Sequence, residues 1–253
     1  MRIVTFNIRY GTADDGPDSW PFRKDRCRAQ IETLNPDLLC LQEALKEQLD
    51  YLQNAFPQMQ QIGVGRDDGA TQGEYAAILT NKNKYQVKTS GTFWLSSTPE
   101  KPGSADWGDT NVRICTWADL GNLTVFNTHL AVASQQAREK GVALILERIP
   151  KGKPTILAGD FNADEDNPAC QALRDAGFLD TYRAIHITGQ AGTYNGFKEK
   201  EDPEKIDYIW ISTGLTTTNA EIVKEKFDKR WPSDHFPVIA DLADSHNAVT
   251  QEP

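Results

Sequence analysis

Six short apolar runs in this chain each carry a polar, chemically versatile residue at one end. In chain order these residues are Asn7, Glu43, His129, Asp160 followed by Asn162, Asp207, and Asp234 followed by His235. The first four runs precede their polar residues, and the last two runs follow theirs. Short runs of this kind are typical of buried strands. If the last two strands run antiparallel to the first four, all these side chains meet at one edge of the fold.

Strand and helix patterns alternate along the whole chain. Strands are predicted over residues 2–8, 37–43, 75–80, 85–95, 111–120, 123–130, 154–160, 206–212 and 235–242. Apolar residues at helical spacing, bounded by prolines, predict helices over residues 23–34, 44–56 and 134–149, and a short helix from Asn167-Pro168. The strands between residues 75 and 130 are expected to form an antiparallel meander, with Gly121-Asn122 as a hairpin turn.

The domain organisation follows from the absence of repeats, low-complexity blocks and Gly/Ser linkers in the sequence. Residues 1–242 are predicted to form a single domain, and residues 243–253 a polar C-terminal tail. Strands outnumber helices, and the helices lie between groups of strands. The predicted fold is therefore α/β, a four-layer α/β/β/α sandwich of two mainly antiparallel sheets with outer helices.

Charge and cysteine content exclude some classes of function. The net charge of −9 argues against a broad basic surface, so duplex DNA is a less favoured partner. Metal-binding carboxylates contribute to this charge, so nuclease chemistry itself is not excluded. The four cysteines are scattered without a CxxC pair, which predicts buried free thiols rather than a zinc site or disulfides.

Location and assembly are weakly constrained by the sequence. No apolar stretch approaches the roughly 18 residues of a membrane span. Met1 is followed at once by a strand-like segment, so no signal peptide is visible and a cytoplasmic monomer is expected. The sequence of a secreted mature chain, or of a shortened one, would read the same way.

The polar set itself has two explanations. For any single position, a polar residue that simply ends a strand is as good an explanation as a functional one. Taken together, the carboxylates, carboxamides and histidines are the inventory of an oxygen-ligand metal site with acid and base helpers. The repeated placement at a shared edge favours the functional explanation.

Six motifs in a fixed order carry a family resemblance. They are TFNIRY (5–10), LQEA (41–44), NTHL (127–130), GDFNA (159–163), KIDYIW (205–210) and SDHFPV (233–238). In this order they resemble the endonuclease/exonuclease/phosphatase superfamily with the DNase-I-like fold, and they span nearly the whole chain. The superfamily includes apurinic endonucleases, deadenylases, inositol polyphosphate phosphatases and neutral sphingomyelinases.

Four further blocks resemble a bacterial branch whose members are usually described only as metal-dependent hydrolases. They are GRDDG (65–69), GEYAAIL (73–79), TFWLSSTPEKPGS (92–104) and RICTW (113–117). The chain departs from similar sequences after His129 and Leu130, where Ala131 and Val132 stand in place of an aspartate and a second histidine. Substrate contacts made from that loop in relatives therefore do not carry over.

The resemblance implies a metal site. Glu43 is the expected principal ligand of Mg2+ or Mn2+, Asn7 lies beside it, and Asp234 completes the site or holds a second ion. These are oxygen donors, the type that such cations prefer. The number of bound metals stays open.

The resemblance also implies five catalytic residues. Asp160 is expected to position and deprotonate the attacking water, and Asn162 to donate a hydrogen bond to the phosphoryl oxygen or to that water. His235 would contact the phosphate with Asp207 holding its other ring nitrogen. His129 would act from the opposite side on the developing charge or the leaving group.

Four residues are candidates for substrate binding. Arg66, Glu74 and Arg113 fall in the branch-specific blocks, where a phosphate clamp and a surface ion pair are equally reasonable. Trp107 lies in a Gly/Pro/Ser-rich loop and could stack a base or sugar, although aromatic residues near strands more often belong to the core.

The predicted function is a divalent-metal-dependent phosphoesterase that cleaves phosphate esters by in-line attack of water, as a phosphodiesterase, phosphatase or nuclease. The expected substrate is a small phosphate ester or a flexible nucleic acid, with the exact ester undetermined. One alternative is a non-catalytic binding module on the same fold. Another is a zinc hydrolase acting on a non-phosphate substrate, although the chain lacks an HExxH or HxH pair.

Overall fold

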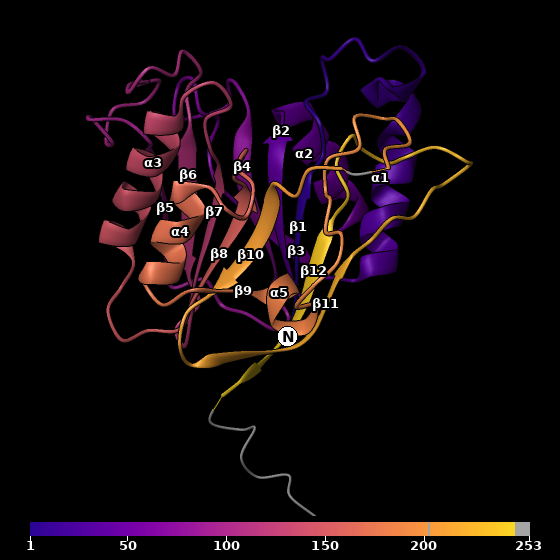
Figure 1. Ribbon diagram of the computed structural model, residues 1–253. Helices are drawn as coiled ribbons and strands as arrows, with labels where there is room; N and C mark the ends of the chain where they lie inside the picture. Colours follow the sequence, from indigo (N-terminus) through magenta and orange to yellow (C-terminus); the bar gives the residue numbers. More distant parts are fainter. Residues whose placement is uncertain (202, 246–253) are drawn as a thin grey trace, which may run out of the picture.

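Two mixed β-sheets packed face to face form the centre of the molecule (Figure 1). The computed structural model describes residues 1–201 and 203–245. Within these residues each sheet has six strands. Helices α1 (Trp20–Leu34) and α2 (Lys46–Ala55) cover one outer face, and α3 (Gln135–Arg148) and α4 (Pro168–Asp175) cover the other. The predicted four-layer α/β/β/α sandwich is confirmed.

The first sheet brings both ends of the chain together. Its order is β11 (Leu215–Ile222), β12 (Val238–Asp244), β1 (Arg2–Asn7), β2 (Leu38–Ala44), β4 (Tyr75–Asn81) and β3 (Met59–Ile62). Strands β1 and β2 pair in parallel, and β12 runs antiparallel to β1. The N-terminus lies at the bottom of Figure 1, so β1 carries Asn7 to the upper edge.

The second sheet is built in the same way. Its order is β5 (Thr89–Trp94), β6 (Ile114–Asp119), β7 (Thr124–His129), β8 (Thr155–Asp160), β10 (Asp207–Ile211) and β9 (Leu179–Asp180). Strands β7 and β8 are parallel, and β10 is antiparallel to β8. The short helices η1 (Gly16–Asp18) and α5 (Thr181–Ile185) complete the described elements.

Some local expectations were wrong. Only β5, β6 and β7 form the predicted meander, because β4 pairs with β2 and β3 in the other sheet. Strands β3, β9 and β11 and helix α5 were not anticipated. The last strand begins at Val238 instead of residue 235 and runs to Asp244, into the predicted tail. Residues 246–253 of that tail lie outside the described residues.

Several predicted boundaries are confirmed by their capping contacts. The Ser134 hydroxyl accepts a hydrogen bond from the backbone of Ala137 at the start of α3. The Asn167 side chain accepts one from Ala169 at the start of α4, with Pro168 in the first turn. Each cap satisfies a backbone donor that a helix start leaves unpaired. Leu120 donates to the carbonyl of Leu123 across the expected two-residue turn.

The hydrophobic core has three layers because both faces of each sheet are covered. On β1, Ile3 packs between the two sheets, whereas Val4 and Phe6 pack under α1 and α2. The strand reads as a continuous apolar run because alternate side chains enter different layers. Burial of each such side chain contributes about 1.5–3 kcal/mol. The four cysteines are all buried and free, as predicted.

A buried pair of amides joins the sheets near the edge at which Asn7 lies. Gln42 donates to the side chain of Asn127 at 2.7 Å and to the hydroxyl of Thr5 at 3.0 Å. Asn127 in turn donates to the backbone carbonyls of Leu41 and Ala77. These bonds fix the two sheets relative to each other, because breaking one would leave a buried polar group unpaired.

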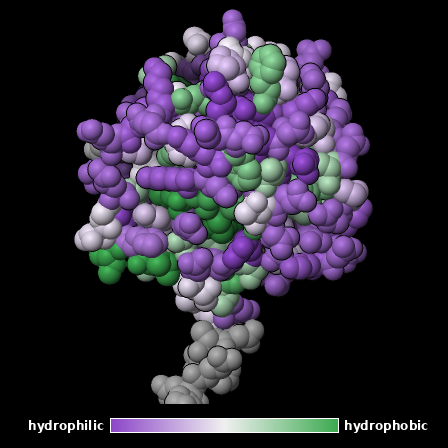
Figure 2. Space-filling model, turned by 90° about the vertical axis from the view of Figure 1, so that its right-hand side faces the viewer, coloured by the Kyte–Doolittle hydropathy of each residue, from purple (hydrophilic) through white to green (hydrophobic). Residues whose placement is uncertain are grey.

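The surface is predominantly polar. Figure 2 shows one side of the molecule, hydrophilic around most of its outline with an apolar area near the middle. Among the described residues, the large apolar side chains that are exposed are Phe22, Val132, Leu179, Ile185 and Ile187. No helix within residues 1–201 and 203–245 is both long enough and apolar enough to cross a membrane.

Candidate active site

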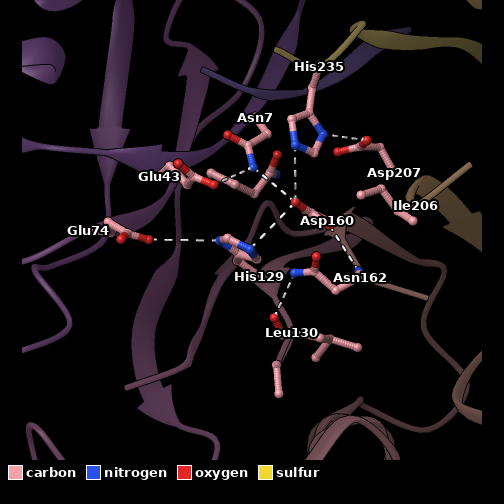
Figure 3. Close-up of polar contacts among 12 residues, drawn as sticks. Asn7, Glu43, Glu74, His129, Leu130, Asp160, Asn162, Ile206, Asp207 and His235 are labelled. Carbon is pink, nitrogen blue, oxygen red and sulfur yellow. Dashed lines mark hydrogen bonds and ion pairs between the residues drawn. The ribbon is translucent and has the colours of Figure 1, made fainter. Parts of the chain in front are cut away.

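The polar residues at the strand ends converge on one edge of the sandwich (Figure 3). In the second sheet Asp160 is the register partner of His129 on β7 and of Asp207 on β10. In the first sheet the parallel pairing of β1 and β2 brings Asn7 and Glu43 to the same edge. His235, which lies three residues before the start of the antiparallel strand β12, reaches the same edge, 3.8 Å from Asp160 Oδ2. The predicted strand directions are therefore confirmed, and we call this cluster the rim.

Glu43 reaches the rim through an irregularity in β2. The pairing of β2 with β4 shifts register between Leu41 and Ala44, and Glu43 has a φ of 60°. A left-handed residue other than glycine stores about 1–3 kcal/mol of strain and is found most often at functional sites. The bulge turns the side chain so that its Oε1 accepts from Asn7 at 3.0 Å and its Oε2 accepts from the backbone of Tyr10 at 3.1 Å.

Asn7 links the two carboxylates nearest to it. Its Nδ2 donates to Glu43 at 3.0 Å and to Asp160 at 2.9 Å, while its oxygen accepts from the backbone of Arg9. The fully buried amide therefore orients both carboxylates across the gap between the sheets.

Asp160 lies close to both histidines of the rim and to Asn7. Its Oδ2 lies 3.5 Å from His129 Nε2 and 3.8 Å from His235 Nε2, and also accepts from Asn7. Its Oδ1 accepts from the backbone of Asn162 at 2.9 Å. Burial raises the pKa of Asp160, and the nearby charge of Asp207 raises it further. A carboxylate whose pKa lies above the usual range is better matched to accepting a proton near neutral pH.

His235 forms a short hydrogen-bonded pair with Asp207. Its Nδ1 lies 2.8 Å from Asp207 Oδ2, and both side chains are buried. Burial alone would lower the pKa of His235, but the charge of Asp207, their hydrogen bond, and the charges of Asp160 and Asp234 raise it to about 10. The imidazole is therefore positively charged at neutral pH.

His129 has the opposite surroundings. Its Nδ1 is buried, 3.9 Å from Glu74 Oε2, and has no hydrogen-bond partner among the described residues. Burial lowers the pKa of His129 well below 6.5, and the positive charges of Arg113, Arg66 and His235 lower it further. The imidazole is therefore neutral at neutral pH.

Asn162 and Asp234 complete the predicted set. Asn162 has a φ of 46°, and its side chain donates to the carbonyl of Leu130 at 3.0 Å. Asp234 is buried, and its Oδ2 lies 3.7 Å from Arg9 Nε. Burial raises the pKa of Asp234, with Glu43 adding to the effect while His235 and Arg9 oppose it.

The substrate-binding candidates divide into two groups. Arg66, Glu74 and Arg113 line a recess together with His129, next to the rim. Trp107 packs beside α3 instead, where its ring lies 5.6 Å from the Lys140 ammonium and its carbonyl accepts from Ser134. The contacts of Trp107 are therefore those of a residue that supports a helix.

Two arginines of the site were missed in the sequence. Arg9 lies within the motif TFNIRY, which was a usable signal, and it carries the ion pair to Asp234. Arg23 on α1 is fully buried and donates to the carbonyls of Ile8, Arg9 and Pro232. It ties the segment after Asn7 to the segment before Asp234. The helical pattern of α1 gave no sign of this role.

The donor set of the rim fits a divalent cation. The ligand atoms of Glu43, His129 and Asp160 lie within 4.8 Å of one another, as do those of Asp160, Asp207 and His235. Buried carboxylates whose charge is disfavoured by burial gain most from a cation, and an oxygen-rich set is typical of Mg2+ or Mn2+. Asp234 does not belong to either of these groups within the described residues.

The architecture and rim together define a DNase-I-like α/β sandwich with a carboxylate-histidine site. The Endonuclease/Exonuclease/phosphatase family pattern matches residues 4–235. The chain therefore belongs to the endonuclease/exonuclease/phosphatase family, whose members are hydrolases of phosphate esters.

Solved structures and curated proteins agree with this assignment. An endonuclease/exonuclease/phosphatase from Bacteroides vulgatus is 34% identical with a TM-score of 0.90, covering 96% of this chain and 98% of that one. The mannosyl-6-phosphatase of Bacteroides thetaiotaomicron is 29% identical with a TM-score of 0.89, covering 96% and 99%. Nocturnin from Xenopus laevis is 24% identical, covering 96% of this chain and 72% of its own.

Proposed function

We propose that this chain is a divalent-metal-dependent phosphoesterase that cleaves a phosphate ester by in-line attack of water. The observation that carries the proposal is the position of Asp160, which lies between a charged and a neutral histidine and is joined by Asn7 to Glu43. Hydrolysis of a phosphate ester requires a base beside a metal-binding carboxylate. It also requires groups that contact a phosphoryl oxygen, and the two histidines are placed to do so.

Glu43 is the proposed principal ligand of Mg2+ or Mn2+, with Asn7 holding its orientation and Asp234 as a further proposed ligand. A bound divalent cation would neutralise the phosphate charge and lower the pKa of a bound water. The unusual backbone of Glu43 supports this role, because the bulge in β2 directs the carboxylate into the rim.

The remaining residues of the rim divide the chemistry. Asp160 accepts the proton of the attacking water. Asn162, whose side chain donates to the carbonyl of Leu130, is the proposed donor to the phosphoryl oxygen or to that water. His235, kept charged by Asp207, donates a hydrogen bond to the phosphoryl group. The neutral His129 contacts that group from the other side of Asp160. Donors fixed on both sides stabilise the charge that develops in the transition state.

The substrate is proposed to be a small phosphate ester or a flexible nucleic acid. The mannosyl-6-phosphatase among the relatives favours a small phosphomonoester. The net charge of −9 favours neither duplex DNA nor any other long polyanion.

The proposal is tested with a panel of phosphomonoesters and phosphodiesters after removal of metal with EDTA. We expect activity to return with Mg2+ or Mn2+, and Glu43→Gln to lower kcat by at least about a hundredfold. Glu32→Gln is the matched control, because Glu32 is exposed on α1 and pairs with Arg28. Binding of Zn2+ without hydrolysis of any phosphate ester in the panel would favour the zinc hydrolase acting on a non-phosphate substrate. Failure to bind any metal, with no effect of Glu43→Gln, would favour the binding module.

A further inference from the structure

The outer face of the second sheet carries a cavity just beyond the end of α3. Its volume is about 230 Å³, and it is lined by Trp117, Asp119, Thr124, Phe126, Arg148 and Pro150. Helix α3 covers this face of the sheet and ends at Arg148 (Figure 1). The cavity therefore begins where the helix stops covering the strands.

Two neighbouring cross-strand pairs form the floor of this cavity. Trp117 on β6 pairs with Phe126 on β7, and Asp119 pairs with Thr124. Phe126 packs in the layer under α3, and alternate residues of a strand share a face, so all four side chains lie on the outer face. Gly91 on β5 leaves room for the indole, because a Cβ there would lie 2.9 Å from Trp117 Nε1. The floor is therefore an aromatic pair beside a polar pair.

Arg148 supplies the charge that is available to a ligand. Asp119 is already paired, because its Oδ1 accepts from Lys153 Nζ at 2.5 Å and from the backbone of Gly121 at 2.7 Å. Among the described residues Arg148 makes one hydrogen bond, from Nη2 to Glu100 at 2.6 Å, and the Glu100 side chain is 77% exposed. Ion pairs with so exposed a partner are weak. The planar guanidinium therefore keeps N–H donors for an anion, and carboxylates match its geometry.

We propose that this cavity is a second ligand site, which binds a small aromatic carboxylate. The ring packs against Trp117 and Phe126, and the carboxylate pairs with Arg148. An apolar cavity of about 150 Å³ can hold benzene, so 230 Å³ accommodates a single ring with its carboxylate. The Thr124 hydroxyl is buried on the floor and has no hydrogen-bond partner among the described residues. An aromatic lining with a few polar groups is typical of small-molecule sites.

The cavity is separate from the rim. Thr124 begins β7 and His129 ends it, so the two residues lie at opposite ends of one strand, about 17 Å apart. A ligand of one ring cannot contact both places. The second site therefore does not depend on the proposed function, and either can fail without the other.

The test is an NMR titration of the chain with benzoate, in which the backbone amides of Trp117 and Phe126 are followed. We expect both signals to shift with one dissociation constant, about millimolar or lower, as is usual for so small a ligand. Cyclohexanecarboxylate lacks the aromatic ring and benzyl alcohol lacks the charge, so each should bind at least about fivefold more weakly. Equal binding of either analogue, or no shift of these amides with benzoate, overturns the proposal.

Two variants separate the contribution of the charge from that of the ring. Arg148→Met removes the guanidinium, so we expect benzoate to bind at least about fivefold more weakly and benzyl alcohol to bind as it does to wild type. Trp117→Leu should weaken the binding of both. Arg28→Met is the matched control, because Arg28 is an exposed arginine on α1 that pairs with Glu32. Thermal unfolding checks that each variant is folded. Unchanged benzoate binding by folded Arg148→Met overturns the site.

A variant of the rim shows where the ligand binds. Asp160→Asn should bind benzoate as wild type does, with and without Mg2+. Loss of binding by this variant would place the ligand at the rim and overturn the second site. Shifts of the Trp117 and Phe126 amides that follow protein concentration without ligand would show that a second copy of the chain covers the cavity, and would also overturn it.

Discussion

The two histidines of the rim lie on opposite sides of Asp160 and differ in the partner of their Nδ1 and in their charge. His235 has a carboxylate at 2.8 Å and a pKa raised to about 10. His129 lacks a hydrogen bond at its Nδ1 within the described residues, and its pKa is lowered. Burial lowers the pKa of both imidazoles, but at His235 the charge and hydrogen bond of Asp207 outweigh it, whereas at His129 the charges of Arg113 and Arg66 add to it.

This contrast shows how one fold can present two different imidazoles to one substrate. A charged histidine offers a strong donor to an anionic oxygen, whereas a neutral one can donate without adding charge. The Nε2 atoms of His129 and His235 lie 3.5 Å and 3.8 Å from the same oxygen, Asp160 Oδ2. The asymmetry therefore gives the proposed reaction a charged side and a neutral side.

The largest effect is expected when the residue shared by both sides is changed. Asp160→Asn keeps the shape of the side chain but cannot accept a proton, so we expect kcat to fall at least about a hundredfold. Steady-state hydrolysis by metal-replete, folded protein measures this. Near-normal turnover would remove Asp160 from the role of base.

The next effect concerns the charged side alone. Asp207→Asn removes the main cause of the raised pKa of His235, so the imidazole loses its proton at a lower pH than in wild type. We expect kcat to fall about tenfold near pH 6 and about a hundredfold near pH 9, since the charged form is lost as the pH rises. A pH-rate profile checks this. If the ratio of the kcat of Asp207→Asn to that of wild type does not vary with pH, Asp207 does not set the charge of His235.

The neutral side should respond differently. His129→Gln removes a donor that is uncharged throughout the working range, so we expect about a tenfold loss. The ratio to wild type should stay flat between about pH 6 and about pH 9, because His129 does not titrate there. A loss that grows or shrinks across this range would mean that His129 changes its charge, and would end the distinction between the two sides.

The smallest expected effect on kcat comes from Arg23, which supports only the segments around Asn7 and Asp234. Arg23→Met leaves the carbonyls of Ile8, Arg9 and Pro232 without this donor, so we expect unfolding to need about 2 kcal/mol less. Urea denaturation measures the change, with Arg28→Met as control. Equal stability of the two variants would show that Arg23 does not hold these segments together.

The fold could be predicted where each strand carries its own signal. Apolar runs such as IVTF before Asn7 and TILAG before Asp160 are buried on both faces, so their composition alone marks them. Strand β3 (Met59–Ile62) and strand β11 (Leu215–Ile222) were not predicted, because both lie at sheet edges and carry exposed polar residues. The pairing of β4 with β2 is a long-range choice that no local pattern records.

The convergence of the rim residues at one edge was predictable from the sequence, but their local geometry was not. Strand direction explains why Asn7, His129 and Asp160 meet, and the ordered motifs pointed to the same positions. The bulge that turns Glu43 depends on its pairing with β4, and the burial of Arg113 depends on the packing of two sheets. Both arise only when distant segments come together.

The most direct test of the central claim is hydrolysis of the best phosphate ester in water labelled with heavy oxygen, before and after metal is restored. If the rim activates water for attack at phosphorus, the label enters the released phosphate, and only when Mg2+ or Mn2+ is present. Label found in the released alcohol, or release that does not depend on metal, would contradict the account.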